Sequence, residues 1–330
     1  MKAAIYTRYG PPDALQISDI EKPVPKDGEV LIQVRAASVN PYDWHFLRGT
    51  PYPLRILAGL RKPKNQRLGA DVAGVVEAVG KNVMQFRPGD EVFGAGRGSF
   101  AEYVCASEEK LALKPASVTF EQAASVPIAG LTALQGLRRG GLTGKGEARS
   151  TQKVLINGAA GGVGTFAVQI AKSFGAEVTG VCSTGKVETV RSLGADHVID
   201  YTKENLTKSG QRYDMIFECA ASQSLFALQR VLSPRGNYIM VGVADARGRW
   251  MMGMVARLFG AVALSWFSSK KLVMVGARVT KEDLTRLGDL MRTGKVTPVI
   301  DKSYGLHELP EAIRYVETGH ARGKSVIAVR

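Results

Sequence analysis

The stretch VLINGAAGGVG, residues 154–164, indicates the fold of the middle of the chain. Its first three residues are aliphatic, as in a buried parallel strand. Glycines then predict a tight turn, and a helix is expected from Thr165 to Phe174, with Phe166 and Ile170 on one face. Strand, glycine-rich turn and helix in this order are typical of a dinucleotide-binding unit, in which the helix N-terminus stabilises a pyrophosphate.

Strands and helices continue to alternate beyond this turn. We expect strands at 178–181, 198–199, 215–217 and 238–241, and helices at 186–193 and 225–232. Such alternation predicts a doubly wound parallel sheet, the Rossmann arrangement. In the first third of the chain, by contrast, short apolar runs are separated by turns such as Pro88, Gly89 and Asp90. This pattern favours a β-rich, barrel-like unit, so the chain is expected to be α/β with two kinds of domain.

Length and composition set the broad class. The chain has 330 residues, which suits about two domains at roughly 150 residues each. Hydrophobic residues at 45% and charged residues at 22% favour folded domains over disorder. Three cysteines, Cys105, Cys182 and Cys219, are too few for a disulfide framework. We therefore expect a reduced, cytoplasmic protein, and the first residues lack the pattern of a secretory signal.

The net charge of +14 has two interpretations, a solvated basic surface or an attraction for anions. Basic residues gather at 61–67 and at 138–149. Neither cluster contains the interleaved aromatics of a nucleic-acid stacking platform, so nucleic acid is not the expected partner. The longest apolar stretch, residues 250–267, carries Arg257 near its middle. A membrane span tolerates a central arginine poorly, so we predict a buried helix or pocket lid there and no membrane span.

The end of the second strand of the alternating region bears on cofactor choice. NAD-dependent enzymes usually place Asp or Glu there to bind the ribose hydroxyl. Residues 182–186 read CSTGK instead, and Glu188 comes only later, on the helix. The hydroxyl of Ser183 and the ammonium of Lys186 suit a 2′-phosphate, with Tyr201 after the next strand as a candidate third contact. We therefore predict NADPH, the alternative for Lys186 being a solvent-exposed position at a helix start.

These motifs together resemble the medium-chain dehydrogenase/reductase superfamily, in its zinc-free quinone oxidoreductase branch. The resemblance rests on AGLTA at 129–133, the glycine-rich turn and LGAD at 193–196, and it covers essentially the whole chain. It implies a GroES-like catalytic domain at 1–127 and 268–330. A Rossmann NADPH-binding domain at 128–267 interrupts it, and a homodimer is also implied.

The resemblance assigns the phosphate contacts of the cofactor residue by residue. The pyrophosphate is expected to touch Ala160, Gly161, Gly162, Val163 and Gly164. The family usually has Ser where this chain has Ala160, which removes one hydroxyl donor and leaves the backbone donors. Ser183, Lys186 and Tyr201 are expected to hold the 2′-phosphate.

The resemblance also assigns residues to the nicotinamide end. Thr132 and Asn40 are expected near the nicotinamide ribose, and Gly242 beside the nicotinamide. A terminal segment is expected to fold back near the cofactor; it consists of His320, Ala321 and Arg322, and Lys324 lies beside it.

Metal chemistry is not expected. Zinc-dependent relatives place Cys and then a His-Glu pair in the first domain, where this chain has SVNPYD at 38–43 and GAD at 69–71. Neither stretch offers a thiolate or an imidazole at the expected place. Cysteines and histidines are otherwise scattered, whereas a structural zinc needs about four clustered ligands. We therefore predict no metal, and the cofactor itself is expected to carry out the difficult step.

A metal-free site favours hydride transfer from NADPH to an acceptor that is already electrophilic, a quinone or an α,β-unsaturated carbonyl. A proton donor to the acceptor oxygen would assist; Tyr42, His45 and Tyr52 are candidates, with packing or surface roles, or solvent as donor, as the alternatives. Trp44, Phe46 and the 250–267 stretch are candidates for an apolar pocket wall or for core packing.

Two other functions stay open. One is a zinc-free alcohol or carbonyl dehydrogenase; the other is a nucleotide-sensing or RNA-binding protein with little turnover.

Overall fold

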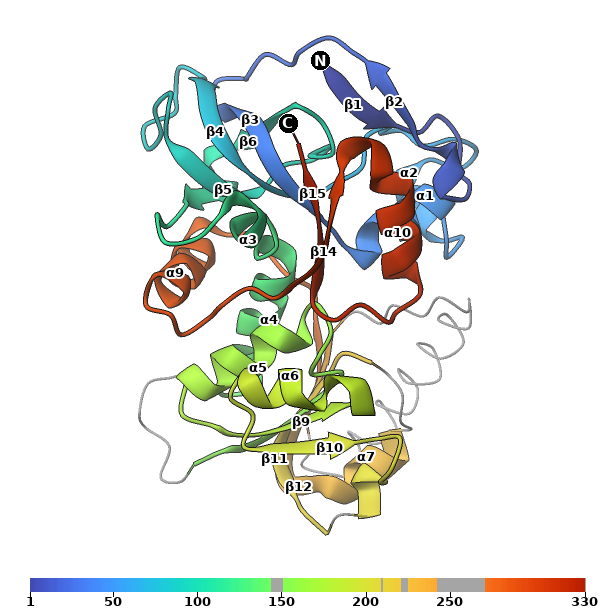
Figure 1. Cartoon of the computed structure of the whole chain (residues 1–330), viewed down its shortest axis with the longest axis vertical. Helices are drawn as coiled ribbons and strands as arrows, with labels where there is room; N and C mark the ends of the chain where they lie inside the picture. The colour runs from blue at the N-terminus through green and yellow to red at the C-terminus, as the bar shows by residue number, and fades with distance from the viewer. Residues whose placement is uncertain (144–150, 209, 221–224, 242–270, 330) are drawn as a thin grey trace. The chain divides into compact units, whose positions relative to one another are not determined.

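The computed structural model describes residues 1–143, 151–208, 210–220, 225–241 and 271–329 (Figure 1). The chain divides into two compact units, Met1–Leu131 with Arg278–Arg330, and Thr132–Ala277. Helix α4 (Pro127–Arg139) spans the first division. The mixed α/β class predicted from the sequence is confirmed. Of the predicted domain boundaries, that at 267/268 lies outside the described residues, as do Gly242 and the 250–267 stretch.

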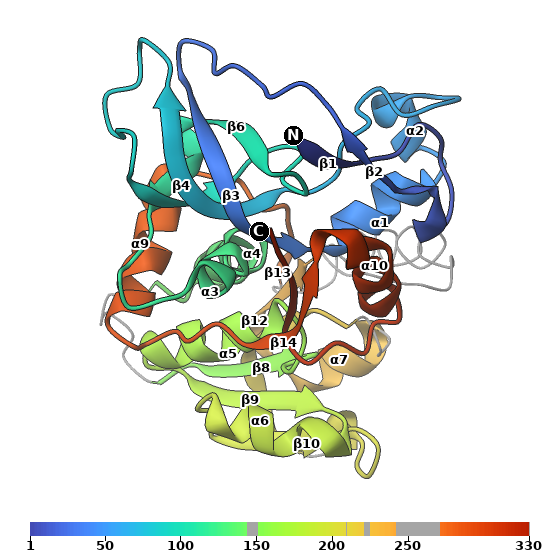
Figure 2. The ribbon, with the colours of Figure 1, turned by 45° about the horizontal axis from the view of Figure 1, so that its top comes forward.

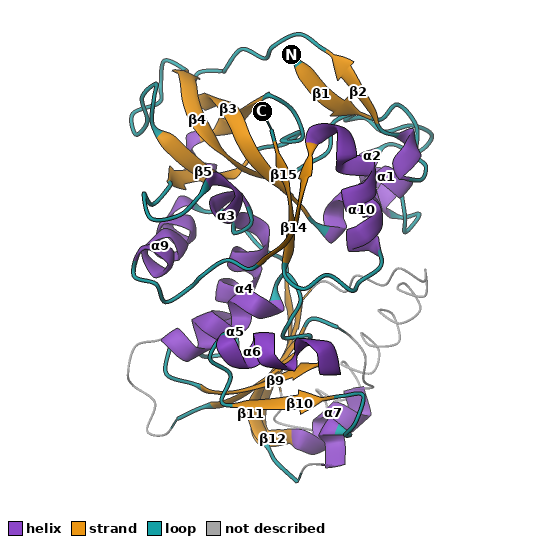
Figure 3. Cartoon of the chain, viewed as in Figure 1, coloured by secondary structure: helices purple, strands orange, loops and turns teal. Residues whose placement is uncertain are grey.

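The first unit is built on a largely antiparallel sheet, whose strands are drawn in orange in Figure 3. Its strands follow the order β14-β15-β3-β4-β5-β7, with β6 added to β3. The bounds are β3 Glu29–Val39, β4 Asp71–Val79, β5 Glu91–Ala95, β6 Tyr103–Ser107, β7 Leu111–Leu113, β14 Ile300–Gly305 and β15 Lys324–Ala328. Because β15 pairs antiparallel with β3, the end of the chain returns to the sheet formed by its beginning.

A glycine on β4 lets the backbone of β3 pass where a side chain would otherwise lie. A Cβ on Gly74 would lie 2.1 Å from the carbonyl oxygen of Gln33, so no other residue fits that position. On β3 the register shifts between Val34 and Ala36, which marks a bulge opposite this close approach. The two strands therefore bring Ser38 and Asp71 into register at the end of β3.

Helices of the first unit join and flank this sheet. They are α1 Pro41–Arg48, α2 Leu54–Ala58, α3 Phe120–Ala124, α9 Lys281–Arg292 and α10 Leu309–Glu317, beside the small strand pair β1 Lys2–Ile5 and β2 Gln16–Asp19. Helix α1 follows β3 directly, because Asn40 is its N-cap and the Asn40 backbone N–H donates to the side chain of Asp43 at 2.8 Å. Gly49, in the left-handed region, ends the helix.

The second unit contains a six-stranded parallel sheet in the order β10-β9-β8-β11-β12-β13, most of which is labelled in Figure 2. Its elements are β8 Lys153–Asn157, α5 Gly164–Ser173, β9 Glu177–Cys182, α6 Val187–Ser192, β10 His197–Asp200, β11 Tyr213–Glu218, α7 Leu225–Val231, β12 Leu232–Val241 and β13 Lys271–Val275. Numbered along the chain, these strands follow the 3-2-1-4-5-6 order of the Rossmann fold. The predicted parallel sheet is confirmed. Phe166 and Ile170 are fully buried on α5, as their spacing predicted.

Within the described part of the chain, no helix has the length and apolar character that crossing a bilayer requires.

Candidate functional site

The glycine-rich turn between β8 and α5 is tight, and its own backbone contacts require glycine at particular positions. Gly158 adopts φ +82°, which favours glycine, and its carbonyl oxygen accepts the N–H of Gly161 at 3.0 Å. A Cβ on Gly164 would lie 2.1 Å from that same oxygen, so the first residue of α5 must be glycine. A Cβ on Gly161 would meet nothing closer than 3.4 Å. The turn thus leads directly into the N-terminus of the ten-residue helix α5, the position at which the sequence predicts a pyrophosphate.

The residues predicted for the 2′-phosphate come from the ends of two paired strands. Cys182 and Asp200, the last residues of β9 and β10, are register partners. Ser183 and Tyr201 therefore follow at the same sheet edge, and the Tyr201 N–H donates to the Cys182 carbonyl at 3.1 Å. Lys186 ends the 3-10 turn Thr184–Lys186 directly after Ser183. The fold brings the backbones of these three residues to one edge.

Asp200 is a member of this edge that the sequence reasoning missed. Its carboxylate accepts the hydroxyl of Thr184 at 2.6 Å and that of Thr202 at 2.7 Å. These hydrogen bonds, that of Thr184 above all, hold the pKa of Asp200 below its ordinary value. The position of Asp200 at the end of β10, next to the end of β9, is the signal that identifies it once strand order is known.

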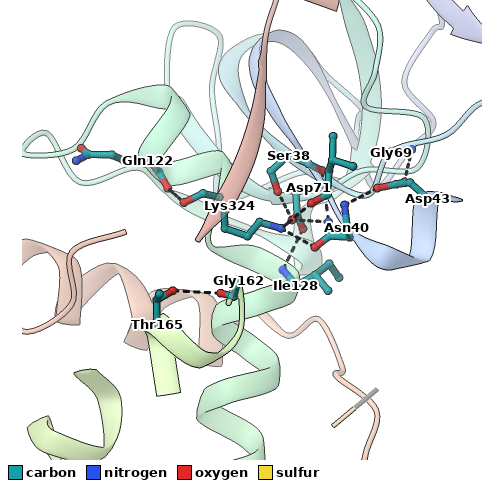
Figure 4. Close-up of polar contacts among 12 residues, drawn as sticks. Ser38, Asn40, Asp43, Gly69, Asp71, Gln122, Ile128, Gly162, Thr165 and Lys324 are labelled. Carbon is teal, nitrogen blue, oxygen red and sulfur yellow. Dashed lines mark hydrogen bonds and ion pairs between the residues drawn. The ribbon is translucent and has the colours of Figure 1, made fainter. Parts of the chain in front are cut away.

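The described residues of the first unit contain a buried polar cluster at the end of β3 (Figure 4). Asp71 is fully buried, and its Oδ2 accepts the hydroxyl of Ser38 at 2.6 Å and the side-chain N–H of Asn40 at 2.8 Å. Its Oδ1 accepts the backbone N–H of Ile128 at 3.0 Å. Both carboxylate oxygens of Asp71 therefore accept hydrogen bonds from donors of the first unit.

Lys324, at the start of β15, supplies the positive charge of this cluster. Its side chain is 4% exposed, and its Nζ donates to Asn40 Oδ1 at 2.6 Å and to the Val39 carbonyl at 3.0 Å. The same Nζ lies 3.7 Å from Asp71 Oδ2. Burial lowers the pKa of Lys324, while the negative charge of Asp71 opposes that shift.

Asn40 is therefore fixed at both ends of its amide. Oδ1 accepts from Lys324, and Nδ2 donates to Asp71, so the two charged partners define which way the amide points. Asn40 itself is 3% exposed. Nearby, the buried carboxylate of Asp43 accepts the backbone N–H groups of Asn40 and Gly69. Burial nevertheless raises the pKa of Asp43 to about 7.

The three candidate proton donors lie on or near α1 in different surroundings. His45 Nδ1 is 2.9 Å from the Thr50 carbonyl, and because a carbonyl only accepts, Nδ1 carries the proton. Burial lowers the pKa of His45, so the neutral ring is favoured and Nε2 is an acceptor. Tyr42 packs against Phe46 with ring centroids 4.3 Å apart, and burial raises its pKa. Tyr52 is 72% exposed.

Trp44, a candidate wall residue, is a buried core residue stacked on His45. The terminal segment is anchored within the first unit: the Arg322 N–H donates to Asp301 at 2.7 Å, and the His320 N–H to the Thr318 hydroxyl at 3.3 Å. Ala321 is half-buried between them. Thr132 is 8% exposed on α4.

Similarity to known proteins agrees with this fold. The model described as alcohol dehydrogenase GroES-like domain matches residues 26–116, and the model described as zinc-binding dehydrogenase matches residues 193–327. The mitochondrial NAD(P)H oxidoreductase RTN4IP1 of Mus musculus is 36% identical, over 100% of this chain and 89% of the relative. The 2-methylene-furan-3-one reductase of Solanum lycopersicum is 35% identical, over 99% of this chain and 79% of the relative. The structure of the quinone oxidoreductase from Coxiella burnetii has a TM-score of 0.83 at 30% identity, with 100% and 99% coverage.

With relatives this similar over its whole length, the chain belongs to the medium-chain dehydrogenase/reductase superfamily. It is an oxidoreductase, and the predicted combination of a GroES-like and a Rossmann domain is confirmed. The Mus musculus relative is named an NAD(P)H oxidoreductase, which states a nicotinamide cofactor for that protein.

Proposed function

We propose that this oxidoreductase transfers hydride from NADPH to a quinone or an α,β-unsaturated carbonyl without a metal ion. The observation that carries the proposal is the buried ammonium of Lys324, which lies against Asn40 and Asp71. These two residues stand in the stretches where zinc-dependent relatives place their ligands. A cation that the protein itself supplies already balances the carboxylate there.

The side chains at these positions do not suit zinc. The Asn40 amide is a neutral group already bonded at both ends, and Asp71 receives hydrogen bonds on both oxygens. A zinc ion would have to share this pocket with the ammonium of Lys324, which repels it. Zinc prefers thiolate, imidazole and free carboxylate ligands. Within the described residues, no three His, Cys, Asp or Glu side chains gather where they could hold a metal.

NADPH rather than NADH is supported by the edge formed by β9 and β10. Ser183, Lys186 and Tyr201 follow the strand ends, and no carboxylate directly follows β9 to bind a ribose hydroxyl. Asp200 is close in the sheet, but Thr184 and Thr202 occupy its oxygens. We infer that these hydrogen bonds hold its carboxylate away from the phosphate. The glycine-rich turn, 160–164, holds the pyrophosphate, and the bound cofactor supplies the hydride.

The remaining cofactor contacts are part of the same proposal. Asn40 and Thr132 lie at the nicotinamide ribose, and the segment 320–322 folds back near the cofactor. Homodimerisation and a cytoplasmic location stay predictions; the relatives include a mitochondrial protein.

The acceptor class is supported by chemistry and by relatives. A site without a Lewis acid cannot stabilise an alkoxide well, so it suits acceptors whose conjugation already makes a carbon electrophilic. Two relatives are named for such acceptors, a quinone and a 2-methylene-furan-3-one. The proton for the reduced oxygen comes from solvent or from Tyr42 or Tyr52, because His45 in its neutral Nδ1–H form presents an acceptor at Nε2.

The test is a panel of acceptors with purified enzyme. NADPH oxidation is followed with quinones, alkenals and simple aldehydes, and NADP⁺ reduction with secondary alcohols. The proposal predicts faster turnover with quinones or alkenals than with aldehydes or alcohols. Faster oxidation of a secondary alcohol than reduction of any conjugated acceptor would favour the dehydrogenase alternative. No turnover with any acceptor, together with salt-dependent RNA binding, would favour the binding-protein alternative.

A further inference from the structure

Helix α2 and the turn after it present apolar and basic side chains together on the surface of the first unit. Ile56, Leu57 and Leu60 are 68%, 79% and 71% exposed, and Tyr52 just before the helix is 72% exposed. The next residues, Arg61, Lys62 and Lys64, are also exposed. We call these seven side chains the α2 patch. Single exposed apolar residues are ordinary on protein surfaces, whereas four within nine positions beside three cations form a distinct surface.

The fold holds this patch in place. The Tyr9 hydroxyl donates to the Gly59 carbonyl at 2.6 Å, and Arg55 Nε donates to the Gly49 carbonyl at 2.9 Å. A Cβ on Gly59 would lie 2.1 Å from the Lys62 carbonyl oxygen, so the chain can turn tightly here only with glycine. The Lys64 N–H then donates to the Ala58 carbonyl at 2.7 Å. The exposed side chains therefore stand on a hydrogen-bonded turn.

The charged residues in the sequence segment that carries the patch are all basic. No Asp or Glu occurs between Asp43 and Asp71, whereas arginines and lysines recur throughout that interval. Arg55 points inward, stacked over the rings of Tyr9 and Tyr52. Arg61, Lys62 and Lys64 are exposed, and no acidic residue lies in the same stretch of sequence.

We propose that the α2 patch binds an anionic lipid bilayer at its interface. Exposed leucine and isoleucine side chains enter the boundary between headgroups and acyl chains, where tyrosine also lies favourably. Lysine and arginine beside them reach the lipid phosphates. The patch has both kinds of side chain. The net charge of +14 on the whole chain adds a long-range attraction between the protein and an anionic bilayer.

A second copy of the chain fits this surface less well. If two copies met through the same face, a twofold arrangement would bring the cations of both patches together. Like charges at an interface oppose association, so the basic side chains favour an anionic partner over another patch. The inference does not depend on the reaction, because lipid binding is measured without cofactor or acceptor.

The experiment is co-sedimentation of the full chain with vesicles. Wild type is expected to bind vesicles of phosphatidylcholine with phosphatidylglycerol, to bind phosphatidylcholine alone far more weakly, and to dissociate as salt rises. Each basic residue near an anionic surface contributes about fivefold in affinity, so R61E/K62E/K64E is expected to lose at least about 100-fold. I56S/L57S/L60S is expected to lose about tenfold or more.

Matched substitutions elsewhere separate the patch from general charge and hydrophobicity. V24S/M84S removes two apolar side chains that are 82% and 87% exposed, and R286E/R292E/K295E makes the same charge change on other exposed positions. Both are expected to change binding less than the patch variants, and thermal unfolding checks that all variants fold. The proposal would be overturned if wild type bound neutral vesicles as tightly as anionic ones, or if the control variants lost as much binding as the patch variants. So would a patch variant that changes oligomeric state and leaves vesicle binding intact.

Discussion

Replacing Lys324 with methionine tests the buried cluster most sharply. Methionine has a similar length and keeps the packing of the stem, so the substitution mainly removes the ammonium group. The carbonyl of Val39 and Oδ1 of Asn40 then lose a donor, and Asp71 loses the cation that lay 3.7 Å away.

The expected loss follows from burial. Removing one partner of a buried ion pair typically costs about 3–5 kcal/mol, because the remaining charge is uncompensated. Asp71 retains three hydrogen bonds, from Ser38, Asn40 and Ile128, which limits the damage. We therefore expect K324M to lower the free energy of unfolding by about 3 kcal/mol, at the lower end of that range.

The assay is denaturant unfolding of wild type, K324M and the exposed control K302M. Lys302 is exposed but its ammonium lies 4.0 Å from the centroid of the Tyr315 ring, so K302M is expected to lose at most about 1 kcal/mol. The double variant K324M/D71N removes both charges, so its loss is expected to be smaller than the sum of the two single losses. If K324M is no less stable than K302M, or if the two single losses add, the reasoning about this ion pair fails.

Three further outcomes are expected. Lys186→Ala weakens NADPH binding by about 10- to 100-fold and leaves NADH nearly unchanged, because it removes a charged contact to the 2′-phosphate; equal losses for both cofactors in titrations would refute the assignment. Gly164→Ala lowers Tm because its Cβ would lie 2.1 Å from the Gly158 carbonyl oxygen, whereas Gly161→Ala, with 3.4 Å to the same atom, leaves Tm nearly unchanged; similar melting of the two variants would contradict this. The fold raises the pKa of Asp43 from 3.8 to about 7, so the folded chain binds this proton more tightly than the unfolded chain does. Stability therefore falls as pH rises between those two values. Asp43→Asn is expected to flatten the dependence of Tm on pH over that interval, and the same slope in wild type and variant would contradict the argument.

Local sequence patterns predicted the second unit well. The strand, glycine-rich turn and helix at 154–174 lie next to one another in sequence, so their order alone indicates the parallel sheet. The same holds for Ser183 and Tyr201, which follow the ends of consecutive strands. The place of Gly242 beside the nicotinamide and the buried helix or pocket lid at 250–267 stay predictions, because both lie outside the described residues.

The buried cluster could not be predicted in the same way, because its members are distant in sequence. Lys324 and Asn40 are separated by 284 positions, and they meet only because β15 pairs with β3. The sequence patterns named Asn40 for a cofactor contact, which stays a proposal, and named Lys324 only as a neighbour of the terminal segment; they did not show that the two side chains meet. Nothing local shows that Asn40 has both amide ends bonded within the first unit, or that Asp200 has its oxygens occupied by Thr184 and Thr202.

The most direct test of metal-independent NADPH oxidation combines turnover with zinc analysis on one preparation. The purified protein is dialysed against a chelator, its zinc content is measured, and NADPH oxidation with a quinone is compared before dialysis, after dialysis and after zinc is added back. The proposed function predicts zinc far below stoichiometric amounts and the same turnover in all three states. Stoichiometric zinc, with turnover lost on chelation and recovered on zinc addition, would contradict it.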